Sequence, residues 1–175
     1  MTNPVFEAVR TVLAVREFQD KPIPDEVLRR IVEAGHLSAS ARNLQPWYFV
    51  IVRDREALRG LGALVKTGPY IAGAAAAIVV ATEKAVPYAL SDASRAIQSM
   101  LLVAWGDGVG SNWTGFGGLE DVRKKVGLPD SYDVLAVLPF GYPKRKVGLG
   151  KKKRKALAEV ASSEQFGTPP FLRPA

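Results

Sequence analysis

The sequence predicts an α+β fold in which helices pack against both faces of one mixed β-sheet. Its 175 residues are about the length of one domain, and 47% hydrophobic with 23% charged residues is ordinary for a globular protein. Helical and strand-like patterns are mixed along the chain, with helices leading, and no repeat or low-complexity linker divides it. We therefore expect a single domain over residues 1–175.

The spacing of apolar residues and the positions of helix-breaking residues define the expected elements. Helical spacing predicts helices over residues 4–15, 25–35, 54–66, 91–105 and 119–126. Runs rich in β-branched residues predict strands over 47–52, 75–82 and 133–140, with a short strand or turn at 111–115. The fourth helix is apolar nearly all round, which is typical of a helix buried in a core or in a subunit interface.

Several kinds of active site are excluded by what the chain lacks. It contains no cysteine, which excludes disulfides, thiolate metal sites and a cysteine nucleophile, and its one histidine excludes a multi-histidine zinc site. That residue, His36, follows an apolar helix, and we interpret it as a structural residue or helix cap rather than a base. No nucleophile elbow or carboxylate pair is visible. We therefore expect no metal and no catalytic side chain, but a cofactor that carries the chemistry.

The net charge of +7 comes from one segment. Of the 24 basic residues, eight lie between Lys144 and Lys155, where there is no acid; this leaves 16 basic residues against 17 acidic ones elsewhere. Such a patch binds phosphate of some kind or is a solvated turn. A nucleic-acid-binding module using residues 144–155 is one alternative, although no aromatic residues are interleaved there.

The sequence shows no targeting or membrane-spanning pattern. No basic segment followed by an apolar one begins the chain, and the longest apolar run, residues 71–81, is well short of the roughly 20 residues that a membrane helix needs. We therefore expect a cytoplasmic protein with no membrane partner.

Six segments carry a resemblance to a known family. The chain reads VREFQDKPIPDEVL from Val15, SASARNLQPW from Ser38 and DASRAIQSMLL from Asp92. It then reads GVGSNWTGF at 108–116, GLP at 127–129 with GYP at 141–143, and KKRKALAE at 152–159. In this order the segments resemble the FMN-dependent nitroreductase family of NAD(P)H oxidoreductases, over about residues 5–167.

The resemblance implies a three-layer α+β sandwich that forms a homodimer, with the long central helix buried and FMN at the interface. It implies that NADH or NADPH reduces the flavin and that an electron-poor small molecule, such as a nitroaromatic, quinone or enone, accepts the electrons. The tail 162–175 carries Phe166, Phe171 and Leu172, more apolar residues than so short a segment buries alone. We expect it to dock on the partner subunit, with the chain's own body as the alternative.

Three cationic residues correspond to family positions around the flavin. The resemblance places Arg16 near the ribityl and pyrimidine side, and Lys152 and Arg154 at the phosphate. Guanidinium groups suit these tasks because their planar fork grips phosphate or ring oxygens. The alternative for Arg16 is a surface ion pair, and much of the basic run, above all 144–146, is expected to be solvated.

Two other segments correspond to family positions around the flavin ring. Asn43 and Gln45 offer amides near the ring, and Ser40 lies in the loop that, in the family, reaches the flavin of the opposite subunit. Thr114 and Gly115 match the segment whose backbone lies over the ring, where glycine permits a close approach. The alternative for Asn43 is a helix or turn cap.

One departure from the family pattern concerns the phosphate site. Val12, Leu13 and Ala14 stand where the family has two basic residues and a serine. The lysines at 151–155 are candidates to compensate; otherwise FMN binds weakly, binds in another pose or is replaced by a flavin-like cofactor. A catalytically degenerate flavin-binding or structural dimer is therefore a second alternative.

Overall fold

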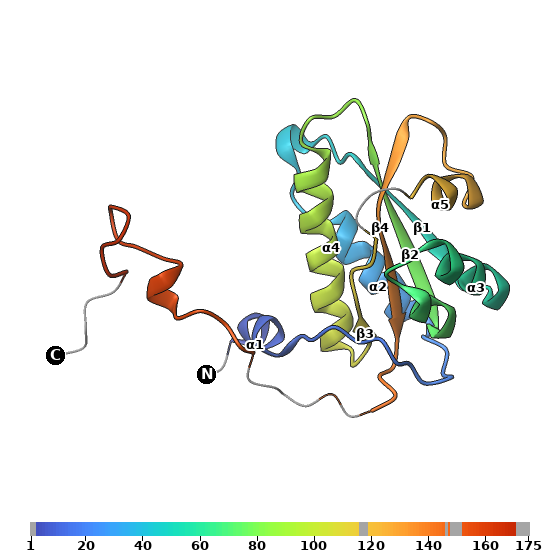
Figure 1. Cartoon of the computed structure of the whole chain (residues 1–175), viewed down its shortest axis with the longest axis horizontal. Coiled ribbons are helices and arrows are strands. Elements are labelled where there is room, and N and C mark those ends of the chain that lie inside the picture. Colours follow the sequence, from blue (N-terminus) through green and yellow to red (C-terminus); the bar gives the residue numbers. More distant parts are fainter. Residues whose placement is uncertain (1–2, 116–118, 146, 148–151, 171–175) are drawn as a thin grey trace.

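The computed structural model of the chain describes residues 3–115, 119–145, 147 and 152–170, and its body is a sheet between two helical layers (Figure 1). The sheet has the order β1-β2-β4-β3. Its strands are β1 (Trp47–Val52), β2 (Ala76–Glu83), β3 (Gly110–Ser111) and β4 (Tyr132–Gly141). Helices cover both faces, as the α+β prediction requires.

The pairing differs from the expected mixed sheet, because β1 with β2, β2 with β4 and β3 with β4 are all antiparallel. Within the described residues, parallel pairing is limited to an isolated bridge between Ala14 and Ser111. The segment that forms this bridge follows helix α1 (Pro4–Thr11) and is too short to make a full strand.

The first helix is shorter than the predicted 4–15. Asn3 caps it, since its Oδ1 accepts hydrogen bonds from the backbone N–H groups of Val5 and Phe6 at 3.0 and 3.1 Å. The helix ends at Thr11, and Val15 donates a backbone hydrogen bond to Ser111 at 2.9 Å. Pairing with a distant residue therefore replaces the last helical turn that the apolar spacing predicts.

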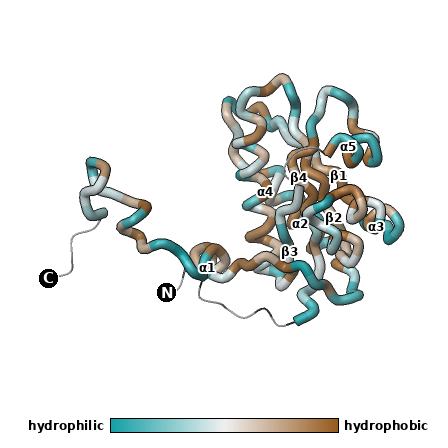
Figure 2. The backbone as a smooth tube through the Cα atoms, viewed as in Figure 1, coloured by the Kyte–Doolittle hydropathy of each residue, from teal (hydrophilic) through white to brown (hydrophobic). Residues whose placement is uncertain are grey.

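One layer packs α2 (Asp25–His36) and α4 (Ala89–Gly106) against the sheet. The other packs α3 (Arg55–Leu64), the 3-10 helix η2 (Pro69–Gly73) and α5 (Glu120–Lys125) on the opposite face. Strand β2 serves both cores by alternation: Ile78 and Val80 face the α4 layer, whereas Val79 faces the α3 layer. Figure 2 shows hydrophobic residues gathered between the layers.

Most remaining elements lie where the sequence predicts them. Strand β1 has the predicted bounds, and Asp54 caps α3 by accepting a hydrogen bond from the Ala57 N–H at 2.7 Å. Helix α4 begins at Ala89, two residues before the predicted start at residue 91. No helix among the described residues is long and apolar enough to cross a membrane.

The C-terminal segment leaves the body of the protein. Residues 152–170 extend away beyond α1 and contain one short 3-10 helix, η3 (Leu157–Glu159) (Figure 1). Phe166 is fully exposed, and Leu157 and Val160 are mostly exposed. The tail residues Phe171 and Leu172 lie outside the described residues.

Candidate functional site

A cavity of about 390 Å³, here called the basic pocket, lies where the C-terminal segment meets α1, α4 and β3. Its cations are Lys152 and Arg154. Its other lining residues are Val9, Val12, Leu13, Ala14, Gln98, Leu101, Ser111, Asn112 and Trp113. Two cations beside amides, a hydroxyl and apolar surface suit a ligand that carries both an anionic group and an apolar part.

Lys152 joins the C-terminal segment to α1. Its Nζ donates a hydrogen bond to the carbonyl oxygen of Val9 at 2.7 Å, near the C-terminal end of the helix. Partial burial, and next the positive charge of Arg154, lower the pKa of Lys152. Two neighbouring cations favour a bound anion, which would relieve their repulsion.

The residues that depart from the family pattern line the same pocket. Val12, Leu13 and Ala14 form part of its wall, with Lys152 and Arg154 among the other lining residues. The positive charge at this place therefore comes from the C-terminal segment rather than from residues 12–14. Compensation by Lys152 and Arg154 for the missing basic residues at 12–14 stays a prediction and belongs to the proposed function.

Arg16 contacts an aromatic ring. Its guanidinium carbon lies 5.8 Å from the centre of the Tyr70 ring, within the range of a cation–π interaction. The Tyr70 hydroxyl accepts a hydrogen bond from the Asn112 side-chain amide. Asn112 in turn lines the basic pocket, so these contacts connect Arg16 to it. Arg16 also lines a neighbouring cavity of about 220 Å³, which shares Ala14 with the basic pocket.

Tyr70 is a residue that the sequence analysis missed. It lies in η2, 42 residues before Asn112, and no motif marks it. Asn112 stands within the resembling segment 108–116, so that segment was the available signal for it.

Thr114 and Gly115 are fixed to the sheet and to the α3 side. The Thr114 hydroxyl, which is buried, donates to the carbonyl oxygen of Val137 at 2.6 Å. Gly115 has φ +80° and donates its N–H to Thr67 Oγ1 at 3.2 Å. Neither lines the basic pocket, although Trp113 just before them does. Phe116, the next residue of the motif, lies outside the described residues.

The predicted amide residues lie elsewhere. Ser40, Asn43 and Gln45 belong to the loop before β1, beside the N-terminal end of α4, whereas α1 and the C-terminal segment lie towards its other end (Figure 1). Ser40 Oγ accepts a hydrogen bond from the Gln45 N–H at 3.0 Å. Gln45 lines a separate groove of about 880 Å³ between α2 and β1. Within one chain, Lys152 and Arg154 share the basic pocket and Arg16 lines the neighbouring cavity, whereas the amide loop lies apart from both.

The rest of the basic run is partly engaged in the fold. Arg145 pairs with Glu17 at 3.5 Å, and the Lys144 N–H donates to the Glu17 carbonyl at 2.9 Å. Lys146 and Lys151 lie outside the described residues. His36 is the last residue of α2 and is exposed, in agreement with its interpretation as a residue at a helix end.

Gly115→Ala tests how tightly the segment beside the pocket is fixed. A Cβ here would lie 2.7 Å from Leu119 Cδ1, on a backbone with positive φ. We expect the free energy of unfolding to fall by more than about 1 kcal/mol in urea titrations at fixed protein concentration. Gly73→Ala is the control, since among the described residues, its chain neighbours aside, no heavy atom lies within 4 Å of its Cβ position. Equal losses in both variants would contradict the expectation.

Comparison with known proteins gives a consistent result. A model of the Nitroreductase family matches residues 10–76 and 65–142. A provisionally named NADH dehydrogenase/NAD(P)H nitroreductase from Methanothermobacter thermautotrophicus is 34% identical over 152 residues, covering 82% of this chain and 80% of the relative. One of the same name from Archaeoglobus fulgidus is 36% identical over 148 residues, covering 79% and 85%.

Solved structures show the same fold. A provisionally named NADH dehydrogenase/NAD(P)H nitroreductase from Parabacteroides distasonis matches with a TM-score of 0.86 at 30% identity, over 94% of this chain and 100% of that one. A provisionally named nitroreductase from Desulfovibrio desulfuricans, solved in complex with FMN, matches with a TM-score of 0.84 at 29% identity, over 95% and 99%. By sequence and by structure, the chain belongs to the nitroreductase family.

Proposed function

We propose that the chain is an FMN-dependent oxidoreductase that passes electrons from NADH or NADPH to an electron-poor small molecule such as a nitroaromatic, quinone or enone. The observation that carries this proposal is the basic pocket, where Lys152 and Arg154 meet residues 111–113 in a member of the nitroreductase family. The FMN complex of the similar Desulfovibrio desulfuricans protein supports the choice of cofactor. We further propose that the protein works in the cytoplasm, where NAD(P)H is supplied.

The donor set of the pocket fits FMN. Lys152 and Arg154 would hold the phosphate, and the Asn112 and Gln98 amides lie in the same lining to bind polar groups. Arg16, held against the Tyr70 ring, would contribute positive charge near the pyrimidine side. The chemistry that FMN supplies when bound is hydride acceptance from NAD(P)H and electron transfer to the acceptor. The chain's own tasks are binding, orientation and charge stabilisation.

We propose that the complete site needs two chains. The amide loop contacts α4 at Asp92, whereas the basic pocket is lined from α4 by Gln98 and Leu101, about 9 to 14 Å further along the helix axis. A second copy related by a two-fold axis would bring its amide loop to the basic pocket of the first. The exposed apolar residues Val5 and Phe6 on α1 and Leu90 on α4 support such an interface.

The C-terminal arm is proposed to complete this dimer. Its exposed apolar residues Leu157, Val160 and Phe166 lie beyond the body of their own chain. The groove between α2 and the edge strand β1 is a suitable receptor, because Leu28, Trp47 and other apolar residues line it. Exchange of the arms would cover both apolar surfaces.

A second candidate is a flavin-binding dimer without turnover. The apolar Val12, Leu13 and Ala14 in the pocket wall favour it, since the family pattern has basic and hydroxyl groups there. The nucleic-acid alternative is disfavoured, because Arg145 and Lys152 are engaged by Glu17 and by α1.

Absorption spectra test the function directly. The purified protein, reconstituted with FMN, is expected to show a bound flavin spectrum that bleaches when NADH or NADPH is added without oxygen. A bound spectrum that does not bleach would favour the flavin-binding dimer without turnover. Absence of flavin binding after reconstitution would contradict both readings.

Arg154→Ala tests the phosphate site. We expect the Kd for FMN to rise about tenfold, equivalent to about 1.4 kcal/mol, because a charge-assisted contact is lost. The Kd for riboflavin, which lacks the phosphate, should not change. Lys153→Ala is the matched control, since Lys153 is exposed and does not line the pocket. An equal effect on both flavins would remove the phosphate role.

Sedimentation tests the two-chain site. The protein is expected to sediment as two copies of the 18.9 kDa chain. Phe6→Asp should shift it towards monomer by placing a charge on an exposed apolar helix face. Arg59→Asp, at an exposed position of α3, should leave the dimer intact. A wild-type monomer at micromolar concentration would contradict the shared site.

A further inference from the structure

The loop before β1 has an unusual backbone. Arg42, Asn43 and Gln45 have φ values of 53°, 55° and 50°, in the left-handed region that side-chain-bearing residues rarely adopt. Of the four such non-glycine residues in the described part of the chain, three lie within this four-residue stretch. Such conformations persist where surrounding contacts determine them, and they concentrate at functional sites.

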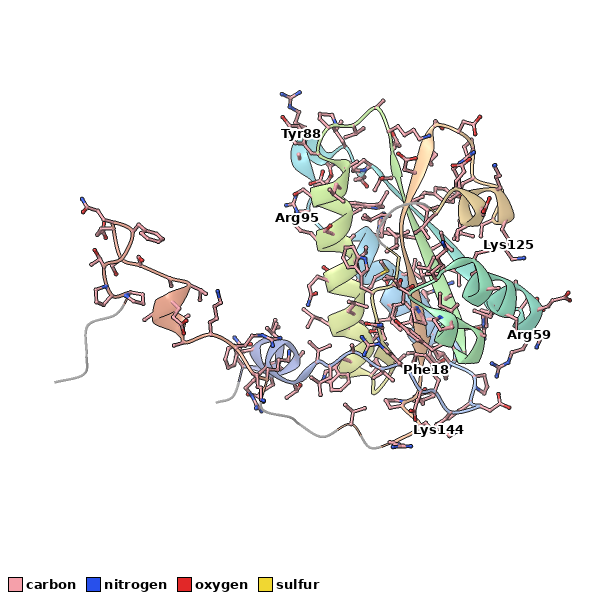
Figure 3. All side chains as sticks on the ribbon, in the orientation of Figure 1. Phe18, Arg59, Tyr88, Arg95, Lys125 and Lys144 are labelled. Carbon is pink, nitrogen blue, oxygen red and sulfur yellow. The ribbon has the colours of Figure 1, made fainter. Side chains whose placement is uncertain are left out.

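One contact that holds this loop comes from a fully buried carboxylate. Asp92, in the first turn of α4, has no exposed surface, and its Oδ2 accepts a hydrogen bond from the Ala41 N–H at 3.0 Å. Its Oδ1 pairs with Arg95, one turn further along the helix. Figure 3 shows Arg95 on the outer side of α4. A buried carboxylate is costly unless it is paired, so both partners are needed to keep it there.

The hydrogen bond from Ala41 to Asp92 lies at the start of the stretch with positive φ values. Ala41 directly precedes Arg42, the first residue with positive φ. At the other end, the Ser40 hydroxyl accepts the Gln45 N–H, and the Pro46 carbonyl accepts the Glu83 N–H of β2 at 3.0 Å. The loop is thus anchored to α4 at its start and to the sheet at its end.

We propose that Asp92 is a positioning residue that fixes the loop in the conformation that presents Asn43 and Gln45, with Arg95 as its counter-charge. The inference rests on the proposed function, in which these amides serve the flavin site of the second chain. A loop held in its binding conformation does not have to be ordered when the ligand binds, which increases affinity.

A simpler role for Asp92 is as an acid at the positive end of the α4 dipole. That role does not require complete burial or a contact with the loop. Exposed acids provide it at the start of α2, where Asp25 and Glu26 stand in the first turn. The burial of Asp92 and its hydrogen bond to Ala41 therefore favour a role in fixing the loop over a role at the helix dipole alone.

Hydrogen exchange of the protein without flavin separates the two roles. Asp92→Leu keeps the number and branching of the side-chain heavy atoms but removes the acceptor oxygens. Asp92→Asn keeps the side-chain shape and one acceptor oxygen. We expect the Leu variant to exchange the Ala41 and Gln45 amides at least about tenfold faster, with β2 and β4 still protected. The Asn variant should restore most of the protection. Arg123→Ala, which breaks the ion pairs of α5 in the other layer, is the control for general destabilisation.

Flavin titrations give a second readout. The Kd for FMN should rise at least about fivefold in Asp92→Leu and much less in Asp92→Asn, at a temperature where both are folded. Unchanged loop exchange in Asp92→Leu, or an equal increase in Arg123→Ala, would overturn the proposal. The proposal would also be overturned if Asp92→Leu and Asp92→Ala both failed to fold while Asp92→Asn folded. Absence of FMN binding to the wild type would instead refute the proposed function and leave the exchange result valid.

Discussion

The packing of α4 against the sheet is the constraint on which the rest of the structure depends. Its buried residues, among them Ala96, Ile97 and Met100, lie in the core formed with α2, β2 and β4. The helix also carries Asp92 for the amide loop, and Gln98 and Leu101 for the basic pocket. One rigid element thus sets the distance between the two groups of predicted site residues.

The basic pocket is lined both by residues that match the family pattern and by residues that depart from it. Val12, Leu13 and Ala14 make apolar wall, and Lys152 and Arg154 bring charge from the far end of the sequence. Lys152 is held by the Val9 carbonyl of α1, so the charged segment is attached to the same helix that leads into residues 12–14. Among the described lining residues, the positive charge of this pocket is therefore supplied by the C-terminal segment alone, with none from residues 12–14.

Local signals were enough to predict much of the fold. The cap at Asp54 and the β-branched run at 47–52 act over a few residues, and both elements were predicted closely. The end of α1 was not, because its limit depends on pairing with Ser111, about 100 residues later. Tyr70 was missed because its contact with Arg16 likewise joins residues that are far apart in the sequence. The left-handed residues 42, 43 and 45 depend on tertiary contacts such as that with Asp92, which no local pattern encodes.

The location of Asn43 and Gln45 away from Lys152 and Arg154 has a thermodynamic consequence. A cofactor site divided between two chains, as we propose, couples ligand binding to subunit association, and this coupling is reciprocal. Flavin then tightens the dimer by the same factor by which dimerisation tightens flavin. Dilution would therefore release cofactor even when free flavin is held constant, so the protein's own concentration becomes a variable in its loading.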